Sequence, residues 1–326
     1  MRRSLTMGTM GEPNVSLVLK VNEAYHDVEG HLYQGKHPEI FEDEKKTWSA
    51  LIDFIRLGEK PFTLLDFGTG TGFVPLQIGK RLRQQDVLLC ADISQGMLDA
   101  CRHNVSKAGF ACRMEFLKVE GGRIKLADQS LDCITMNAVL HHMPDVGFAL
   151  READRLLKPG GRLLIAHEPN AAFYRNLFLR LNSLLLSPRL FAGAVLRRLR
   201  LYETFRRFFG KIQKGYGREN KMLEEVNRRL MSEKAIDTPL SYDRLYELLD
   251  VQSPDLGGTR LGLGIDLMHL KEDFLPTYVM DSYSTYNHLC FEEKKKRRLA
   301  VYERVLKWAF PLSGSGFSAV LRKPGA

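Results

Sequence analysis

The sequence predicts an α/β fold in which a doubly wound parallel sheet is covered by helices on both faces. From residue 61 to residue 168, short apolar runs alternate with amphipathic helical segments. This alternation is typical of strands that are buried on both sides. A glycine-rich loop, Gly68-Thr69-Gly70-Thr71-Gly72, directly follows the first run. In open α/β sheets such a loop lies at the carboxyl edge, where ligands bind.

The residues around this loop indicate which kind of ligand to expect. Glycines let the backbone pass close to a ligand, and the helix that follows points free N–H groups at it. A dinucleotide-binding loop reads G-x-G-x-x-G, but Phe73 stands where its third glycine would fall. Asp66, just before the loop, favours a cationic amino group over a pyrophosphate. A nucleotide-type cofactor other than NAD is therefore predicted at Asp66, Gly68, Thr69, Gly70 and Gly72.

Further strands are predicted at 87–92, 113–119, 133–136 and 163–166. The second ends in Asp92, whose carboxylate can accept hydrogen bonds from ribose hydroxyls. Ser94 is the predicted N-cap of the next helix. The third strand ends at Glu120, and the fourth is followed by Asn137. Because the carboxyl ends of parallel strands share one edge, these polar residues are expected at the same edge as the glycine loop.

Two of these segments carry a family resemblance. Asp-x-Gly-x-Gly-x-Gly at 66–72 and Asp-Ile-Ser-Gln-Gly-Met-Leu at 92–98 resemble the first two motifs of class I S-adenosylmethionine-dependent methyltransferases. The resemblance covers about a third of the chain. It implies a Rossmann-like, seven-stranded sheet with an antiparallel last strand. It also implies S-adenosylmethionine as the cofactor and S-adenosylhomocysteine as the product.

The resemblance also implies roles for individual residues. Asp92 would hold the ribose, and Ile93 and Met97 would pack on the adenine. Glu120 departs from the aspartate usual in the family; it keeps an acceptor for the adenine amino group, on a longer arm. Asn137 completes the predicted cofactor-binding set.

The chain is divided into four predicted regions. Residues 1–60 form an N-terminal helical lid. Tyr33 and His37 are candidate substrate-lid residues, because segments before the first strand often close over the cofactor in this fold. Residues 61–170 form the cofactor-binding core, and 171–250 a helical cap inserted after the fifth strand. Residues 251–326 complete the sheet, with a helix at 266–274, strands at 277–280 and 317–321, and a helix at 291–310 between them.

The predicted cap carries the net positive charge of the chain. The whole sequence has a formal charge of +9, whereas residues 171–221 alone sum to +10, with twelve Lys and Arg against two Glu. The same stretch is rich in Leu and Phe. Three interpretations stay open: a lid that exposes its cations to water, a surface for a membrane or an amphiphilic substrate, and an RNA-binding surface.

Three histidines are candidate catalytic residues. His141 and His142 follow the fourth strand, and His167 ends the fifth. Histidine can remove a proton from an acceptor at neutral pH, although a structural or backbone-capping role is an alternative for each. Only one residue of the pair His141 and His142, and only one of the pair His167 and Glu168, is expected to face the pocket. A metal site from His141, His142 and Glu168 is considered and not predicted, and no cysteine pair with zinc spacing occurs.

The predicted function is S-adenosylmethionine-dependent methyl transfer to a small or lipid-like acceptor, with oxygen favoured over carbon or nitrogen. Alternatives are an RNA methyltransferase that uses the arginine-rich cap, and a cofactor-binding module without turnover. A nicotinamide dehydrogenase is a more distant alternative. No apolar leader and no run of about 18 apolar residues is present, so a cytoplasmic location is expected, with peripheral membrane contact through 171–221 as an option. The sequence does not set the oligomeric state.

Overall fold

The computed structural model describes residues 14–30, 38–120, 123–186, 216–252, 264–289 and 299–325. For residues 38–43, 184 and 216–218 only the backbone is described. The predicted lid residues Tyr33 and His37 lie outside the described residues. Most of the basic stretch, 187–215, lies outside them as well, as does the first half of the helix predicted at 291–310.

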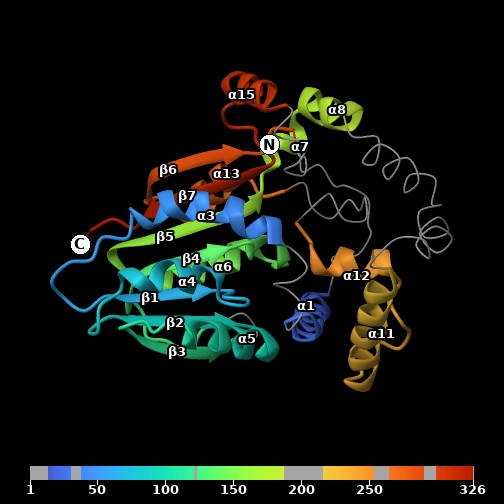
Figure 1. Ribbon diagram of the computed structural model, residues 1–326, viewed down its shortest axis with the longest axis horizontal. Helices are drawn as coiled ribbons and strands as arrows, with labels where there is room; N and C mark the ends of the chain where they lie inside the picture. Colours follow the sequence, from blue (N-terminus) through green and yellow to red (C-terminus); the bar gives the residue numbers. More distant parts are fainter. Residues whose placement is uncertain are drawn as a thin grey trace, which may run out of the picture.

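Seven strands form one mixed sheet in the order β3-β2-β1-β4-β5-β7-β6 (Figure 1). Strands β1 to β5 run parallel, and β7 is antiparallel to both of its neighbours. The predicted Rossmann-like sheet with a reversed last strand is therefore confirmed. The strands are β1 Thr63–Phe67, β2 Val87–Asp92, β3 Arg113–Lys118, β4 Leu131–Asn137, β5 Leu157–Pro169, β6 Val279–Tyr286 and β7 Gly316–Arg322.

Strand β5 begins six residues earlier than the sequence suggested. Lys158-Pro159-Gly160-Gly161 reads as the end of a helix, but the helix already ends at Leu156. Leu157 pairs with Leu131 of β4, and the register shifts before Cys133 pairs with Arg162. The irregular pairing absorbs the proline and the glycines, so these residues lengthen the strand instead of capping a helix.

Alternation of side chains along the strands divides the core into two layers. Leu64, Leu88 and Cys90 pack under α3 Pro38–Ile52, α4 Phe73–Ile78 and α5 Gln95–Ser106. Leu65, Leu89 and Ala91 point to the opposite face, toward α6 Val146–Leu156 and α13 Leu267–Phe274. Helices thus cover both faces of the sheet (Figure 1).

A separate helical unit joins segments that are two hundred residues apart. The helices α1 Val15–Glu29, α11 Tyr216–Ser232 and α12 Tyr242–Leu249 share an apolar cluster around Val21, Val226 and Leu248. They lie together beside the sheet in Figure 1. The Asn22 side chain donates to the carbonyl of Leu248 at 3.2 Å, and Asp27 accepts from the N–H of Gly96 at the start of α5. The sequence analysis assigned these helices to two regions and did not predict their pairing.

A third helical group covers the edge formed by β5, β7 and β6. The helices are α7 Ala171–Arg175, α8 Leu177–Leu186 and α15 Ala300–Ala309. Phe173, Leu179 and Leu306 form its buried contact. Within the described ranges, no helix is both long and apolar enough to cross a membrane.

Substitution of Phe317 tests how much the reversed strand β7 contributes to the stability of the fold. Its side chain is fully buried on β7, and its ring stacks on Tyr283 with centroids 5.7 Å apart. We expect Phe317→Ala to lower the free energy of unfolding by about 3–5 kcal/mol, measured by urea denaturation. Val279→Ala, at an exposed position on β6, should cost less than about 1 kcal/mol. Equal losses would contradict this account of the core.

Candidate functional site

A cavity opens at the carboxyl edge of the sheet, where β1, β2 and β4 end. Its volume, open solvent at the mouth included, is about 1110 Å³. Part of its wall comes from α1, through Leu19, Asn22 and His26. It brings together most of the residues predicted for the cofactor and one candidate histidine: Gly68, Thr69, Gly70, Asp92, Ile93, Met97, Asn137 and His142.

The three glycines of the loop have different tasks, although all have positive φ. A Cβ on Gly68 would lie 2.3 Å from a methyl carbon of Val139. A Cβ on Gly72 would lie 2.8 Å from Cys101 Sγ, so this glycine packs the loop against α5 and does not line the cavity. A Cβ on Gly70 would meet no protein atom within 4 Å, because Gly70 borders the cavity. That open space suits a ligand that lies against the backbone.

Asp92 joins the loop to the cavity. Its Oδ2 accepts from the N–H of Gly70 at 2.8 Å, and its Oδ1 from the N–H of Ser94 at 2.9 Å. Burial raises the pKa of Asp92, although the N–H of Ser94 and the charge of His26 oppose this. A carboxylate has about four acceptor positions, and only two are used here. The remaining positions fit a pair of ribose hydroxyls.

Two predicted contacts differ in the structure. Asp66 is buried beneath the loop and does not line the cavity; its Oδ1 accepts from Thr135 Oγ1 at 2.7 Å. Burial raises the pKa of Asp66 to about 6. Glu120 points into solvent and pairs with Lys125 at 3.0 Å. Because β3 ends at Lys118 and Glu120 bridges back to Arg123, Val119 takes the place on the cavity wall.

Several residues that line the cavity or support its wall were not predicted from the sequence. Trp48 Nε1 donates to Asn137 Oδ1 at 2.8 Å and so orients this predicted site residue. Glu44 lines the cavity from α3, and burial raises its pKa to about 8. Asn22 and His26 lie four positions apart on α1, a spacing that places them on one helix face. That spacing was visible in the sequence, but where the helix docks was not.

His142 is the one of the three candidate histidines that lines the cofactor cavity. It ends a 3-10 turn, Leu140–His142, in which neighbouring side chains point in different directions. Its Nδ1 lies 2.9 Å from the carbonyl oxygen of Leu249 and 3.0 Å from Asp250 Oδ1. Burial disfavours the charged imidazole, but the hydrogen bond and charge of Asp250 outweigh it and raise the pKa of His142.

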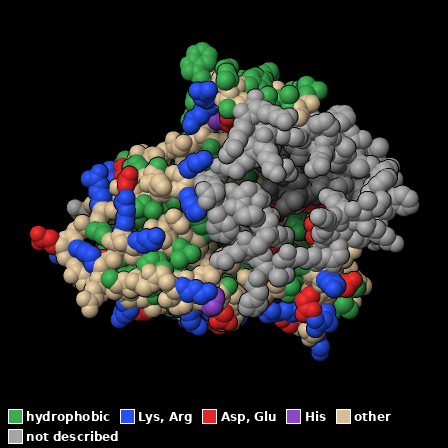
Figure 2. Space-filling model, viewed as in Figure 1, with side chains coloured by type: hydrophobic (Ala, Val, Ile, Leu, Met, Phe, Trp, Pro, Cys, Tyr) green, Lys and Arg blue, Asp and Glu red, His purple; other side chains and the backbone are tan. Residues whose placement is uncertain are grey.

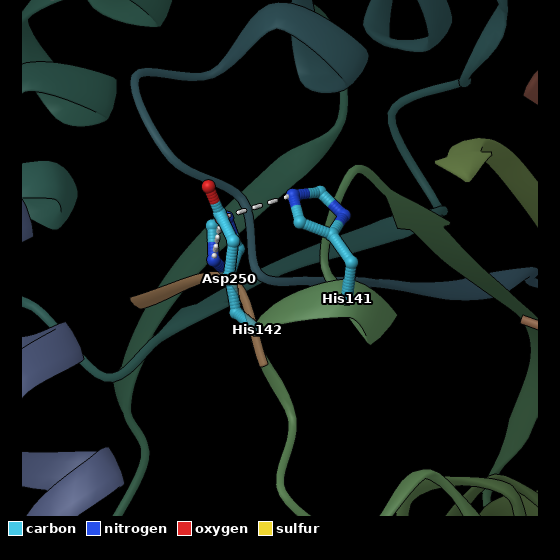
Figure 3. Close-up of side chains that lie close together, drawn as sticks. All are labelled: His141, His142 and Asp250. Carbon is cyan, nitrogen blue, oxygen red and sulfur yellow. Dashed lines mark ion pairs between the residues drawn. The ribbon is translucent and has the colours of Figure 1, made fainter. Parts of the chain in front are cut away.

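His141 points the other way, toward β5. Its Nδ1 lies 2.8 Å from Glu168 Oε2, and its Nε2 lies 3.7 Å from Asp250 (Figure 3). Glu168 also accepts from the N–H groups of Val139, Leu140 and His141, at 2.7–3.1 Å. The buried carboxylate therefore holds the whole turn that carries both histidines.

His167 lies outside the cofactor cavity. Its backbone N–H donates to the Tyr286 hydroxyl at 2.9 Å, and the two rings are 5.3 Å apart. With His141, Glu168 and Tyr174 it lines a second cavity on the β5 side. The adjacent histidines 141 and 142 thus stand on the two sides of a partition between the cavities, with ring centroids 4.0 Å apart.

One group of side chains has the composition of a metal site. Ligand atoms of His141, His142 and Asp250 all lie within 4.8 Å of one another, and two histidines with a carboxylate are a donor set for divalent transition metals. The sequence analysis considered Glu168 as the third ligand; Asp250 takes this place, while Glu168 binds His141 Nδ1. Glu168 already gives a partner to His141 Nδ1, and Leu249 and Asp250 give partners to His142 Nδ1, so this geometry does not require an ion.

Comparisons with known proteins match the core of the chain to methyltransferases. Residues 65–165 match the family model for a methyltransferase domain. The ubiquinone/menaquinone biosynthesis C-methyltransferase UbiE of Brucella anthropi is 30% identical over 146 residues, which are 44% of this chain and 55% of that protein. The protein of the same name from Klebsiella pneumoniae is 33% identical over 103 residues, covering 32% and 41%. The chain therefore spans about half the length of the curated relatives it matches.

A similar solved structure is a SAM-dependent methyltransferase from Aquifex aeolicus. It is 26% identical, and the match covers 39% of this chain and 64% of that one with a TM-score of 0.33.

Gly70, which lines the cavity, and Gly72, which is buried against α5, make a matched test of cofactor binding. We expect Gly70→Arg to fold, because its side chain enters the cavity, and to lose S-adenosylhomocysteine binding in isothermal titration calorimetry. Gly72→Ala should instead lower thermal stability, because its methyl group meets Cys101 at a φ of +91°. Unchanged affinity in a folded Gly70→Arg variant would contradict the assignment of this cavity.

Proposed function

We propose that the chain, whose residues 65–165 match the family model for a methyltransferase domain, transfers the methyl group of S-adenosylmethionine to a lipid-like acceptor that carries an aromatic hydroxyl. The observation that carries this proposal is the cavity itself. It joins the glycine loop and Asp92, which suit the cofactor, to a largely apolar wall in which His142 is backed by Asp250. An apolar wall with a few polar groups suits an amphiphilic molecule.

At the cofactor end, the chain's task is binding and orientation. The backbone at Gly68 and Gly70 gives the cofactor a close surface, Asp92 accepts hydrogen bonds from its ribose, and Ile93 and Met97 offer apolar contact to its base. When bound, S-adenosylmethionine supplies a methyl group on a sulfonium. Much of the rate then comes from holding this methyl group in line with the acceptor.

At the acceptor end, His142 is suited to hold a proton. Its Nδ1 is engaged by Leu249 and Asp250, which leaves Nε2 to accept the proton of an acceptor hydroxyl. A phenolate formed in this way carries negative charge on its oxygen and on ring carbons. Either atom can then attack the methyl group, so the same base serves O- and C-methylation.

We propose carbon as the acceptor atom, which reverses the order that the residues alone suggested. The relatives from Brucella anthropi and Klebsiella pneumoniae are named C-methyltransferases of ubiquinone/menaquinone biosynthesis. The reduced form of such a quinone is an aromatic hydroxyl compound that carries a lipid tail. In the proposed step a bond forms between the ring carbon and the methyl group while the sulfur–methyl bond breaks. The sulfur keeps the electron pair. The ring carbon then releases its proton to solvent, which restores the phenolate, and the phenolate oxygen recovers the proton held by His142.

The experiment that tests this proposal is transfer of a tritiated methyl group into a lysate of the host cell. Products are separated into organic-soluble, RNA, protein and small aqueous fractions, with Gly70→Arg as the blank. Label in the organic fraction, on ring carbon by mass spectrometry, is expected. Label in RNA would favour the arginine-rich cap as an RNA-binding surface instead. Retained cofactor affinity without label in any fraction would favour a binding module.

The His142–Asp250 pair predicts a specific pH dependence. A base must be neutral to accept a proton, so kcat/KM should rise with pH as His142 deprotonates, with a midpoint above about 6.5. Asp250→Asn removes the charge that raises the pKa of His142, so the midpoint should move to lower pH. Asp237→Asn, an exposed control on the loop before α12, should leave it in place. An unmoved midpoint in Asp250→Asn would exclude His142 as the base.

A further inference from the structure

We propose that the exposed faces of α8 and α15 together form one surface that binds an anionic lipid bilayer, from which the acceptor is taken. The binding surface stands on its own observations, and its part in acceptor delivery rests on the proposed function. The sequence analysis considered membrane contact only for residues 171–221. The structure adds the C-terminal helix α15, which lies outside that range.

Helix α8 exposes an apolar stripe. Leu177, Leu181 and Leu185 are spaced four residues apart, which places them on one helix face, and they are 65%, 49% and 78% exposed. Phe178 beside them is 54% exposed. A helix that only covers a core turns polar residues outward, so this stripe needs another explanation.

Helix α15 exposes a matching stripe. Val301, Val305 and Trp308 follow the helical spacing of four and three residues, and Leu312 extends the line just beyond the helix. Trp308 is 84% exposed, more than any other large apolar side chain in the described residues. Tryptophan is enriched where proteins meet the membrane–water interface, because its ring is apolar and its N–H is polar.

The two helices form a continuous surface. The rings of Phe178 and Phe310 lie tilted against each other with centroids 5.6 Å apart, and the Tyr302 hydroxyl donates to Asn182 Oδ1 at 2.9 Å. Leu179 and Leu306 face the interior between them. Figure 2 shows hydrophobic side chains gathered along the upper edge, over α15 and α8. Both helices are thus apolar on their buried and on their outer sides.

The charges around this surface suit anionic headgroups. Arg180, Arg304 and Lys307 are exposed on the two helices. Their described part has a single acid, Glu303, whose carboxylate accepts from the backbone N–H groups of His288 and Leu289. The cations therefore keep their positive field without a neighbouring exposed carboxylate on these helices. Each basic residue near an anionic membrane contributes about 1 kcal/mol to binding.

The surface also connects to the proposed site. Tyr174 belongs to the cluster that holds α8 and α15, and it lines the second cavity with His141. His141 in turn contacts His142, which lines the cofactor cavity. The surface of α8 and α15 is thus linked through Tyr174 to the second cavity, which lies beside the wall that carries the predicted base.

The test is co-flotation of the full chain with vesicles of phosphatidylcholine alone or of phosphatidylcholine mixed with anionic phosphatidylglycerol. The parent protein should float with anionic vesicles, and brominated lipid should quench Trp308, since the other tryptophan, Trp48, is buried. Leu185→Ser with Trp308→Ser should reduce the bound fraction at least tenfold. Met231→Ser, at an exposed position on α11, is the matched control and should bind like the parent.

Several outcomes would overturn the proposal. These are no flotation of the parent, equal flotation of the double variant, a concentration-dependent dimer that the double variant abolishes, or RNA that competes with vesicles at this face. Failure of the proposed function is read separately, by methyl transfer into a detergent-dispersed organic extract of the host cell. A double variant that methylates this extract normally but no longer floats supports the surface. Flotation without any methylation leaves the surface in place and removes the proposed function.

Discussion

The buried carboxylate of Glu168 is the constraint on which the site depends. Three backbone N–H groups and His141 Nδ1 converge on it, and a charge buried in this way is tolerable only when it is so bonded. Glu168 stands on β5 and the turn it holds follows β4, so the carboxylate sets the distance between two strand ends. Val139 of the same turn presses against Gly68. The position of the histidines and the shape of the glycine loop are therefore set together.

The features that could be predicted from the sequence are those that short-range sequence patterns determine. The seven strands, the N-cap at Ser94 and the acid at Asp92 follow from apolar runs, turn residues and spacing within a few residues. The exposure of Glu120 could not be predicted in this way, because one extra residue between the end of β3 and Glu120 turns its side chain to solvent. Asp250 could not be found either, since it meets His142 only through the packing of a helix 107 residues further along the chain.

The helical unit of α1, α11 and α12 supplies a wall of the cavity that the sheet alone does not provide. A sheet edge alone gives a cofactor one wall, and α1 closes the opposite side through Asn22 and His26. The unit is tied to the core at Asp27, which accepts from Gly96 and pairs with Arg229; the bonds from Ser94, Gly96 and Arg229 hold the pKa of Asp27 down against the effect of burial. Because the same carboxylate contacts α5 and α11, it fixes the position of α1 relative to both helices. Asp250 follows α12 directly, so this unit also places the partner of His142.

The raised pKa of His142 is consistent with the chemistry proposed for it. A phenol has a pKa near 10, and a base whose own pKa lies closer to that value removes the proton more readily. Pairing with Asp250 therefore strengthens the base, while it also lowers the neutral fraction at pH values below the raised pKa. An apolar wall around the pair shifts this balance, because burial of an imidazolium disfavours its charge. Asp250 thus raises the pKa of His142, and burial in the apolar wall lowers it. The cavity that suits a lipid-like acceptor therefore also limits the protonation of its base.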